Sequence, residues 1–168
     1  MRLKICGAAQ TVTGSCHLIT LDNGFKILLD CGLYQGHEDE FDDFNQRWLF
    51  NPDDIHVLIL SHAHIDHAGR IPKLVKDGFR GKIYCTSATR DLSAIMLLDS
   101  AHIQETDAEY EAKKRHKKVT PLYTESDAKK CLNHFICVEY NNWFSIHKDV
   151  EVMFTDAGHI LGSAAVTL

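Results

Sequence analysis

The sequence lacks a long hydrophobic run, a secretory leader and any Cys-x-x-Cys pair. Its longest apolar stretch is far shorter than the roughly 20 residues that a bilayer crossing requires, which excludes a membrane-spanning helix. Residues 1–6 have the pattern of a strand and not of a leader, so we expect a cytoplasmic protein with no membrane partner. The six cysteines are then predicted to be free thiols, most of them in the core.

A strong positive charge is also missing. The net charge of -5 has the wrong sign for strong sequence-independent binding to nucleic acid. The one concentrated basic run, at residues 113–118, is better interpreted as the solvated end of a helix, where cations suit the helix dipole, than as an RNA contact. With 168 residues, 45% of them hydrophobic, the chain can bury one core, and no internal repeat or low-complexity linker divides it.

The most informative segment follows a short apolar run. Residues 57–60 are all aliphatic, which is typical of a strand buried on both faces. The loop after this strand carries four metal-ligating side chains: His62, His64, Asp66 and His67. Imidazole and carboxylate without thiolate suit zinc, manganese or iron, whereas structural zinc sites usually use cysteine. The segment therefore predicts a catalytic metal site at the end of the strand.

The spacing of these residues suggests two ions. His62 and His64 alternate, so they can point the same way and chelate one ion. Asp66 and His67 stand at the start of the next helix and can serve a neighbouring ion. Residues 68–74 continue this short helix, which we expect to end at Asp77-Gly78.

The rest of the chain predicts a sheet flanked by helices. Strands at 2–8, 16–21 and 25–30, the last two joined by a hairpin turn, should form an antiparallel portion. A long helix is predicted over 87–114, with an apolar face that packs on the sheet and comprises Leu92, Ile95, Met96 and Ile103. The remaining elements are helices near 41–47 and 125–134 and strands at 82–85, 135–140, 143–146, 150–155 and 164–168.

The His-x-His-x-Asp-His pattern after an apolar strand resembles the metallo-β-lactamase superfamily. Four further segments are similar to one branch of it, the β-CASP ribonucleases, which include RNase J and the cleavage-and-polyadenylation endonuclease: residues 7–18, 28–32, 69–74 and 157–164. The resemblance implies an α/β fold, the metallo-β-lactamase-like αββα sandwich, with a mixed sheet and flanking helices. The chain corresponds to the N-terminal half of that sandwich.

The resemblance also assigns residues to the metal site. His159 lies in a small-residue loop and matches a family ligand, so His62, His64 and His159 would hold the first zinc ion. Asp66 and His67 remain for the second ion, and Asp66 would also be the catalytic residue that orients the attacking water and accepts its proton.

Asp30 ends a predicted strand and is followed by Cys31-Gly32. From there its carboxylate can hydrogen-bond a ligating imidazole and fix the tautomer of the ring. A turn-forming aspartate is the alternative, which the family resemblance makes less favourable.

The activity implied by the resemblance is metal-assisted hydrolysis of RNA phosphodiesters, in mRNA 3′-end processing or RNA degradation. The family's bridging aspartate, last histidine and β-CASP cap do not occur up to Leu168, so we expect residues 1–168 to be a partial metallo-β-lactamase domain. Such a chain should bind one zinc ion tightly at most, bind RNA weakly and be inactive in isolation. It should also self-associate through the exposed edge of its C-terminal strand.

Two other functions stay open. One is a hydrolase of another superfamily branch, acting on a thioester, a lactone or DNA. The other is a metal-binding fragment without catalysis. The substrate that the complete protein turns over, and the reading frame beyond Leu168, would discriminate among them.

Overall fold

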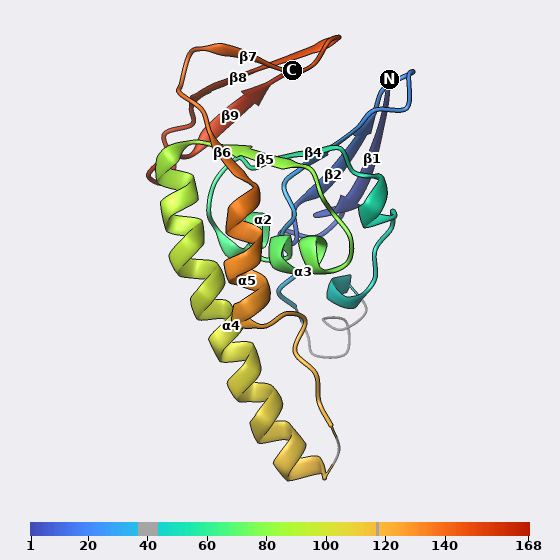
Figure 1. Ribbon diagram of the computed structural model, residues 1–168, viewed down its shortest axis with the longest axis vertical. Helices are drawn as coiled ribbons and strands as arrows, with labels where there is room; N and C mark the ends of the chain where they lie inside the picture. Colours follow the sequence, from blue (N-terminus) through green and yellow to red (C-terminus); the bar gives the residue numbers. More distant parts are fainter. Residues whose placement is uncertain (37–43, 117) are drawn as a thin grey trace.

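The computed structural model describes residues 1–36, 44–116 and 118–168 of the chain. Within them, six strands form one sheet in the order β1-β2-β3-β4-β5-β6, and three form a second sheet in the order β7-β8-β9 (Figure 1). The larger sheet comprises β1 (Arg2–Gly7), β2 (Cys16–Thr20), β3 (Lys26–Leu29), β4 (Val57–Ile59), β5 (Lys82–Cys85) and β6 (Phe135–Cys137). The smaller sheet comprises β7 (Trp143–His147), β8 (Val150–Asp156) and β9 (Ala164–Thr167).

The helices with assigned bounds are α2 (Ile65–Ala68), α3 (Ile71–Lys76), α4 (Ser87–Arg115) and α5 (Glu125–Cys131), with 3-10 turns at Pro52–Asp54 and Leu132–His134. Residues 44–46 are also helical, whereas 41–43 of the helix predicted near 41–47 lie outside the described residues. In the part of the chain that is described, no helix combines the length and hydrophobicity needed to cross a membrane.

The antiparallel portion predicted from the sequence is confirmed. β1 pairs antiparallel with β2, and β2 with β3, across a turn in which Gly24 has a φ of 85°. The next three pairings, from β3 to β6, are parallel. Because parallel strands end at the same edge of a sheet, the residues after β3, β4 and β5 are brought together there.

The centre of the larger sheet is buried on both faces, as the aliphatic run at 57–60 predicts for β4. Leu28 and Leu58 point to a core shared with the helices, while their neighbours Ile27 and Ile59 point to a second core shared with Phe154 of β8. The molecule therefore has three layers: helices, the six-stranded sheet and the three-stranded sheet (Figure 1).

Three elements differ from the sequence prediction by more than a residue at one end. The strand predicted over 135–140 ends at Cys137, and the helix predicted over 125–134 changes to a 3-10 turn after Cys131. The helix expected at 68–74 is two short helices, α2 and α3, with Gly69 and Arg70 between them. Local hydrogen bonding at such ends decides the boundary, and residue preferences do not define it.

The predicted packing face of the long helix is wrong in part, since of its four residues Leu92 and Met96 are half-buried. The buried stripe of α4 consists of small or polar residues together with one leucine: Thr89, Ser93, Leu97, Ala101 and Ala108. Ile95 and Ile103 are instead 68% and 51% exposed. Both sets recur at helical spacing, and the small side chains let the helix approach its neighbours more closely, which the apolar pattern alone does not reveal.

Candidate metal centre

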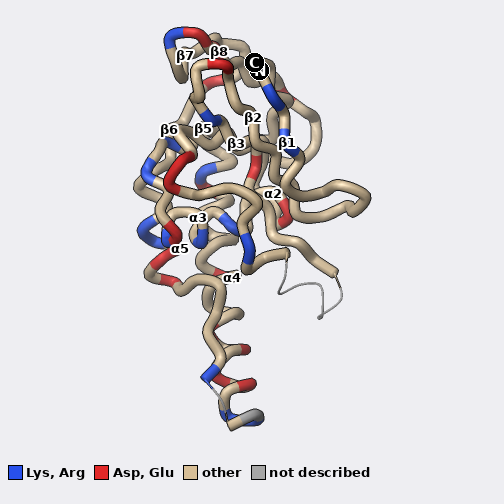
Figure 2. Tube along the Cα trace, turned by 90° about the vertical axis from the view of Figure 1, so that its right-hand side faces the viewer, with Lys and Arg blue, Asp and Glu red and all other residues tan. Residues whose placement is uncertain are grey.

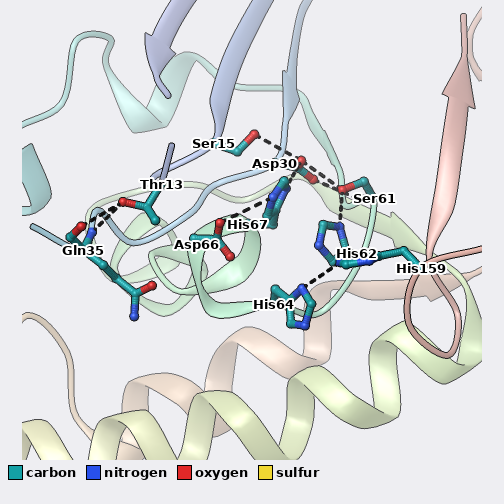
Figure 3. A network of polar contacts seen from close by, with 10 residues as sticks. All are labelled: Thr13, Ser15, Asp30, Gln35, Ser61, His62, His64, Asp66, His67 and His159. Atoms are coloured by element: carbon teal, nitrogen blue, oxygen red, sulfur yellow. Dashed lines mark hydrogen bonds and ion pairs between the residues drawn. The ribbon is translucent and has the colours of Figure 1, made fainter. Parts of the chain in front are cut away.

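Three of the predicted ligands converge at the carboxyl end of β4. His62 and His64 lie on the loop after this strand, and His159 reaches them from the loop between β8 and β9 (Figure 3). One ring nitrogen of each residue lies within 4.8 Å of a ring nitrogen of the other two. Nε2 of His159 and Nδ1 of His64 are 3.1 Å apart.

This arrangement fits a zinc ion. With Zn–N bonds near 2.05 Å, two nitrogens of a tetrahedral site are about 3.3 Å apart, close to the separation between His64 and His159. Three imidazoles leave the fourth position open, as in catalytic rather than structural zinc sites. His62 is 8% exposed and His159 is exposed, so the cluster lies between the core and the solvent.

The loop that carries His159 is attached to the sheet edge by several bonds. Hydroxyls of Thr86 and Thr89, at the start of α4, donate to the carbonyl of Gly162 at 2.7 and 2.8 Å. The backbone N–H of His159 donates to the hydroxyl of Ser163 at 3.2 Å, and Ser163 is 2% exposed. These contacts explain how a histidine 95 residues away from His64 in sequence meets it in space.

Asp30 lies at the centre of a hydrogen-bond network behind the histidines. The residue is only 4% exposed, and its backbone has a φ of 57°, a left-handed conformation that turns the chain sharply after β3. Oδ2 accepts from Nδ1 of His67 at 2.7 Å, which is the kind of bond through which a carboxylate would fix the orientation of a ligating imidazole. It also accepts from the hydroxyls of Ser61 at 2.9 Å and Ser15 at 3.3 Å (Figure 3).

Asp66 and His67 adjoin the cluster of three histidines without belonging to it. Both lie in the first turn of α2, where Nε2 of His67 is 3.7 Å from Oδ2 of Asp66. The rings of His67 and His62 have their centroids 4.0 Å apart. An imidazole nitrogen and a carboxylate oxygen therefore lie next to each other beside the first cluster.

The two neighbouring imidazoles have opposite pKa shifts. Burial, together with the nearby His67, lowers the pKa of His62 to about 4, so that its ring is neutral at physiological pH. Burial by itself would also lower the pKa of His67, but the hydrogen bond and charge of Asp30 and the charge of Asp66 outweigh it and raise that pKa.

Sequence reasoning missed the supporting hydroxyls of Ser61, Thr86 and Thr89. The sequence indicates these roles only weakly, because a serine before a histidine and a threonine before a helix are both common. The sequence Gly162-Ser163 by itself suits a phosphate contact and a turn equally well, and the bonds to Thr86 and His159 favour the turn.

The cysteines and remaining histidines form no second cluster of metal ligands in the described ranges. All six cysteines are free and most lie in the core, as predicted, and Cys137 is the exposed one. Among the histidines, His102 contacts Glu125, and His134 contacts the carbonyl of Gly81.

The fold and the site together define an α/β protein with a cluster of three histidines, able to hold a metal ion, at the carboxyl edge of its sheet. The sequence profile of the Metallo-beta-lactamase superfamily matches residues 10–129. The chain belongs to this superfamily, and the resemblance noted in the sequence is confirmed.

Similar proteins agree with this assignment. The chain is 36% identical over 166 residues to Ribonuclease TTHA0252 of Thermus thermophilus, covering 99% of the chain and 34% of that relative. It is 34% identical over 168 residues to Transcription termination factor FttA of Methanocaldococcus jannaschii, covering all of the chain and 25% of that relative. The chain therefore spans only about a quarter to a third of the length of these proteins.

Solved structures support the fold. A Cronobacter sakazakii metallo-beta-lactamase HARLDQ motif mutant superposes with a TM-score of 0.57 at 18% identity, over 98% of this chain and 54% of that one. MEM-A1, a subclass B3 metallo-beta-lactamase from a soil metagenome library, gives a TM-score of 0.53 at 18% identity, over 93% of this chain and 51% of that one.

Proposed function

We propose that this chain forms part of a zinc-dependent phosphodiesterase that cleaves RNA, in 3′-end processing or RNA degradation. The observation that carries the proposal is the convergence of three imidazoles beside the Asp66–His67 pair at one edge of the sheet. The names of two relatives, a ribonuclease and a transcription termination factor, support RNA as the substrate. An RNA substrate and free thiols both suit a cytoplasmic location.

The residues divide into two groups of ligands. His62, His64 and His159 would hold the first zinc ion, and Asp66 and His67 would contribute to the second. When bound, zinc supplies Lewis acidity for a phosphoryl oxygen and increases the acidity of water.

Asp66 would act as the catalytic residue. Its side chain is 24% exposed, so its carboxylate can reach a water molecule in the site. It would orient this water toward phosphorus and accept its proton. His67 stands beside it, and the charge of Asp66 contributes to the raised pKa of His67.

We also propose that residues 1–168 are one part of a larger catalytic domain, with little activity by themselves. Two ligands are too few for a tight second ion, so one zinc ion at most should bind firmly. RNA binding should be weak, because the net charge is -5 and Lys and Arg are interspersed with Asp and Glu along the trace (Figure 2).

The test compares two polypeptides, the 168-residue chain and the product of the full reading frame that encodes it. Each is supplied with zinc and assayed on single-stranded RNA, a thioester, a lactone and DNA. We expect zinc-dependent RNA cleavage by the product of the full reading frame, little cleavage by the 168-residue chain, and loss of activity in Asp66→Ala. Asp107→Ala, a change of an exposed acid on α4, is the matched control.

Three results would overturn parts of the proposal. Turnover of a thioester, lactone or DNA without RNA cleavage would assign the chain to another branch of the superfamily. Robust RNA cleavage by the 168-residue chain, abolished by Asp66→Ala, would show that the site is complete without further residues. Zinc binding with no turnover of any substrate by either polypeptide would instead indicate a non-catalytic metal-binding protein.

A further inference from the structure

We propose that Ser61 is a positioning residue that forms a hydrogen-bond relay between Asp30 and His62. Its hydroxyl donates its single proton to Asp30 and must therefore accept a hydrogen bond from Nδ1 of His62. Through this relay, one buried carboxylate would set the tautomers of His62 and His67, which belong to different metal positions. The inference deepens the proposed function and rests on its assignment of these two histidines as ligands, but the tautomers themselves exist without metal.

The relay begins at a carboxylate that can only accept hydrogen bonds. Oδ1 of Asp30 accepts the backbone N–H of Ser61 at 2.8 Å, and Oδ2 is approached by Ser61 Oγ, Ser15 Oγ and His67 Nδ1. An ionised carboxylate carries no proton, so every one of these neighbours must be the donor. His67 therefore carries its proton on Nδ1, which leaves the lone pair of Nε2 on the side of Asp66.

Ser61 in turn fixes which ring nitrogen of His62 carries the proton. The hydroxyl of Ser61 has one proton, and that proton is committed to Asp30. Its oxygen also lies 2.9 Å from Nδ1 of His62, and with no second proton to give it must accept there. His62 is therefore the Nδ1–H tautomer, and its Nε2 has the free lone pair that a metal ion requires.

The backbone of Ser61 makes the direction testable. Its N–H points at Oδ1 of Asp30 and cannot become an acceptor. In Asp30→Asn, the amide oxygen must therefore take the Oδ1 position, which places the NH₂ group, a donor, where Oδ2 was. Asparagine also tolerates the left-handed φ of 57° at this position, so the backbone needs no change.

Asp30→Asn should therefore reverse the donor and acceptor roles in each hydrogen bond of the relay. The new NH₂ group donates to His67 Nδ1 and to Ser61 Oγ, and Ser61 then donates its proton to His62 Nδ1. Both imidazoles become Nε2–H tautomers, which cannot bind a metal through Nε2. Ser61→Ala removes only the branch to His62, while Ser61→Thr keeps the hydroxyl and with it the relay.

The first experiment measures the tautomers in the metal-free protein by long-range ¹H–¹⁵N NMR of the imidazole rings at a pH where both rings are neutral. We expect Nδ1–H at His62 and His67 in the wild type and in Ser61→Thr, and Nε2–H at both in Asp30→Asn. In Ser61→Ala only His62 should become a mixture. Nε2–H at His62 in the wild type, or an unchanged Nδ1–H in Ser61→Ala, would overturn the inference.

The second experiment measures zinc affinity by competition with a chromophoric chelator. Ser61→Ala should weaken the first ion about 10- to 100-fold, as loss of an orienting partner typically does, and Ser61→Thr should restore the affinity. Far-UV circular dichroism checks that all variants are folded. Wild-type protein that binds no zinc would refute the proposed function while the NMR result still decides the relay; equal affinity in Ser61→Ala and the wild type would refute the positioning role.

Discussion

The loop that brings His159 to the other ligands depends on Gly162, which makes Gly162→Ala a sharp perturbation. Gly162 has a φ of 83°, and a Cβ built on it would lie 2.5 Å from the backbone nitrogen of Thr89 and 2.7 Å from the hydroxyl of Thr86. The loop must therefore move, and the bonds from both hydroxyls to its carbonyl would be weakened. Gly158, in the same loop, provides a matched control, because its φ is 64° and nothing lies within 4 Å of its Cβ position.

The expected magnitudes follow from these differences. Both substitutions carry a left-handed backbone penalty of about 1–2 kcal/mol. Gly162→Ala adds the loss of two hydrogen bonds, worth about 1 kcal/mol each, so its free energy of unfolding should fall by about 3–4 kcal/mol. The zinc affinity of Gly162→Ala should also fall at least about tenfold, because His159 is displaced.

The assay is urea denaturation of the metal-free protein, followed by zinc titration against a chelator. Gly158→Ala should lose about 1–2 kcal/mol of unfolding free energy and keep its zinc affinity within a few-fold. Equal destabilisation and equal affinity in the two variants would refute the view that contacts of Gly162 position His159.

Three further predictions follow from the site and the sheet edges. Elemental analysis after exhaustive dialysis should find one zinc ion per chain at most, and His62→Ala should abolish it; two equivalents, or unaltered binding in the variant, would contradict the ligand assignment. In the folded protein the pKa of His62 is lowered from 6.5 to about 4, so between these pH values the unfolded chain binds more protons than the folded one. The free energy of unfolding of the metal-free protein should therefore fall by up to about 3 kcal/mol as the pH falls from 6.5 to 4. The raised pKa of His67 acts in the opposite sense, because it contributes stability at low pH that is lost as the pH rises through this pKa. Urea denaturation across this pH range should show that the free energy of unfolding falls more steeply with acid in the wild type than in His62→Gln. Finally, in the described part of the chain β9 pairs only with β8, and Leu168 beside it is 47% exposed, so sedimentation should detect self-association through this edge; a monomer at all concentrations would refute that expectation.

Much of the fold could be predicted from the sequence because its signals are local. The hairpin turn at residues 22–24, the aliphatic run at 57–60 and the four ligands after it each depend on neighbours along the chain. The apolar residues of strands and helices recur with a period that backbone geometry sets, so these elements can be recognised without knowing which other elements they contact. The first ligands and the edge of the sheet at which they stand were therefore readable from residue order.

The contacts across the fold were decided only in three dimensions. Asp30 meets His67 and Ser61 because β3 and β4 are parallel neighbours, and the position of His159 depends on hydroxyls of α4 that hold its loop. The buried face of α4 was mispredicted, because two stripes with helical spacing compete and only the fit against the sheet and α5 selects the one with small side chains. Residue order determined which groups the site contains, whereas tertiary packing determined which ring nitrogens face one another and which hydroxyl protons orient them.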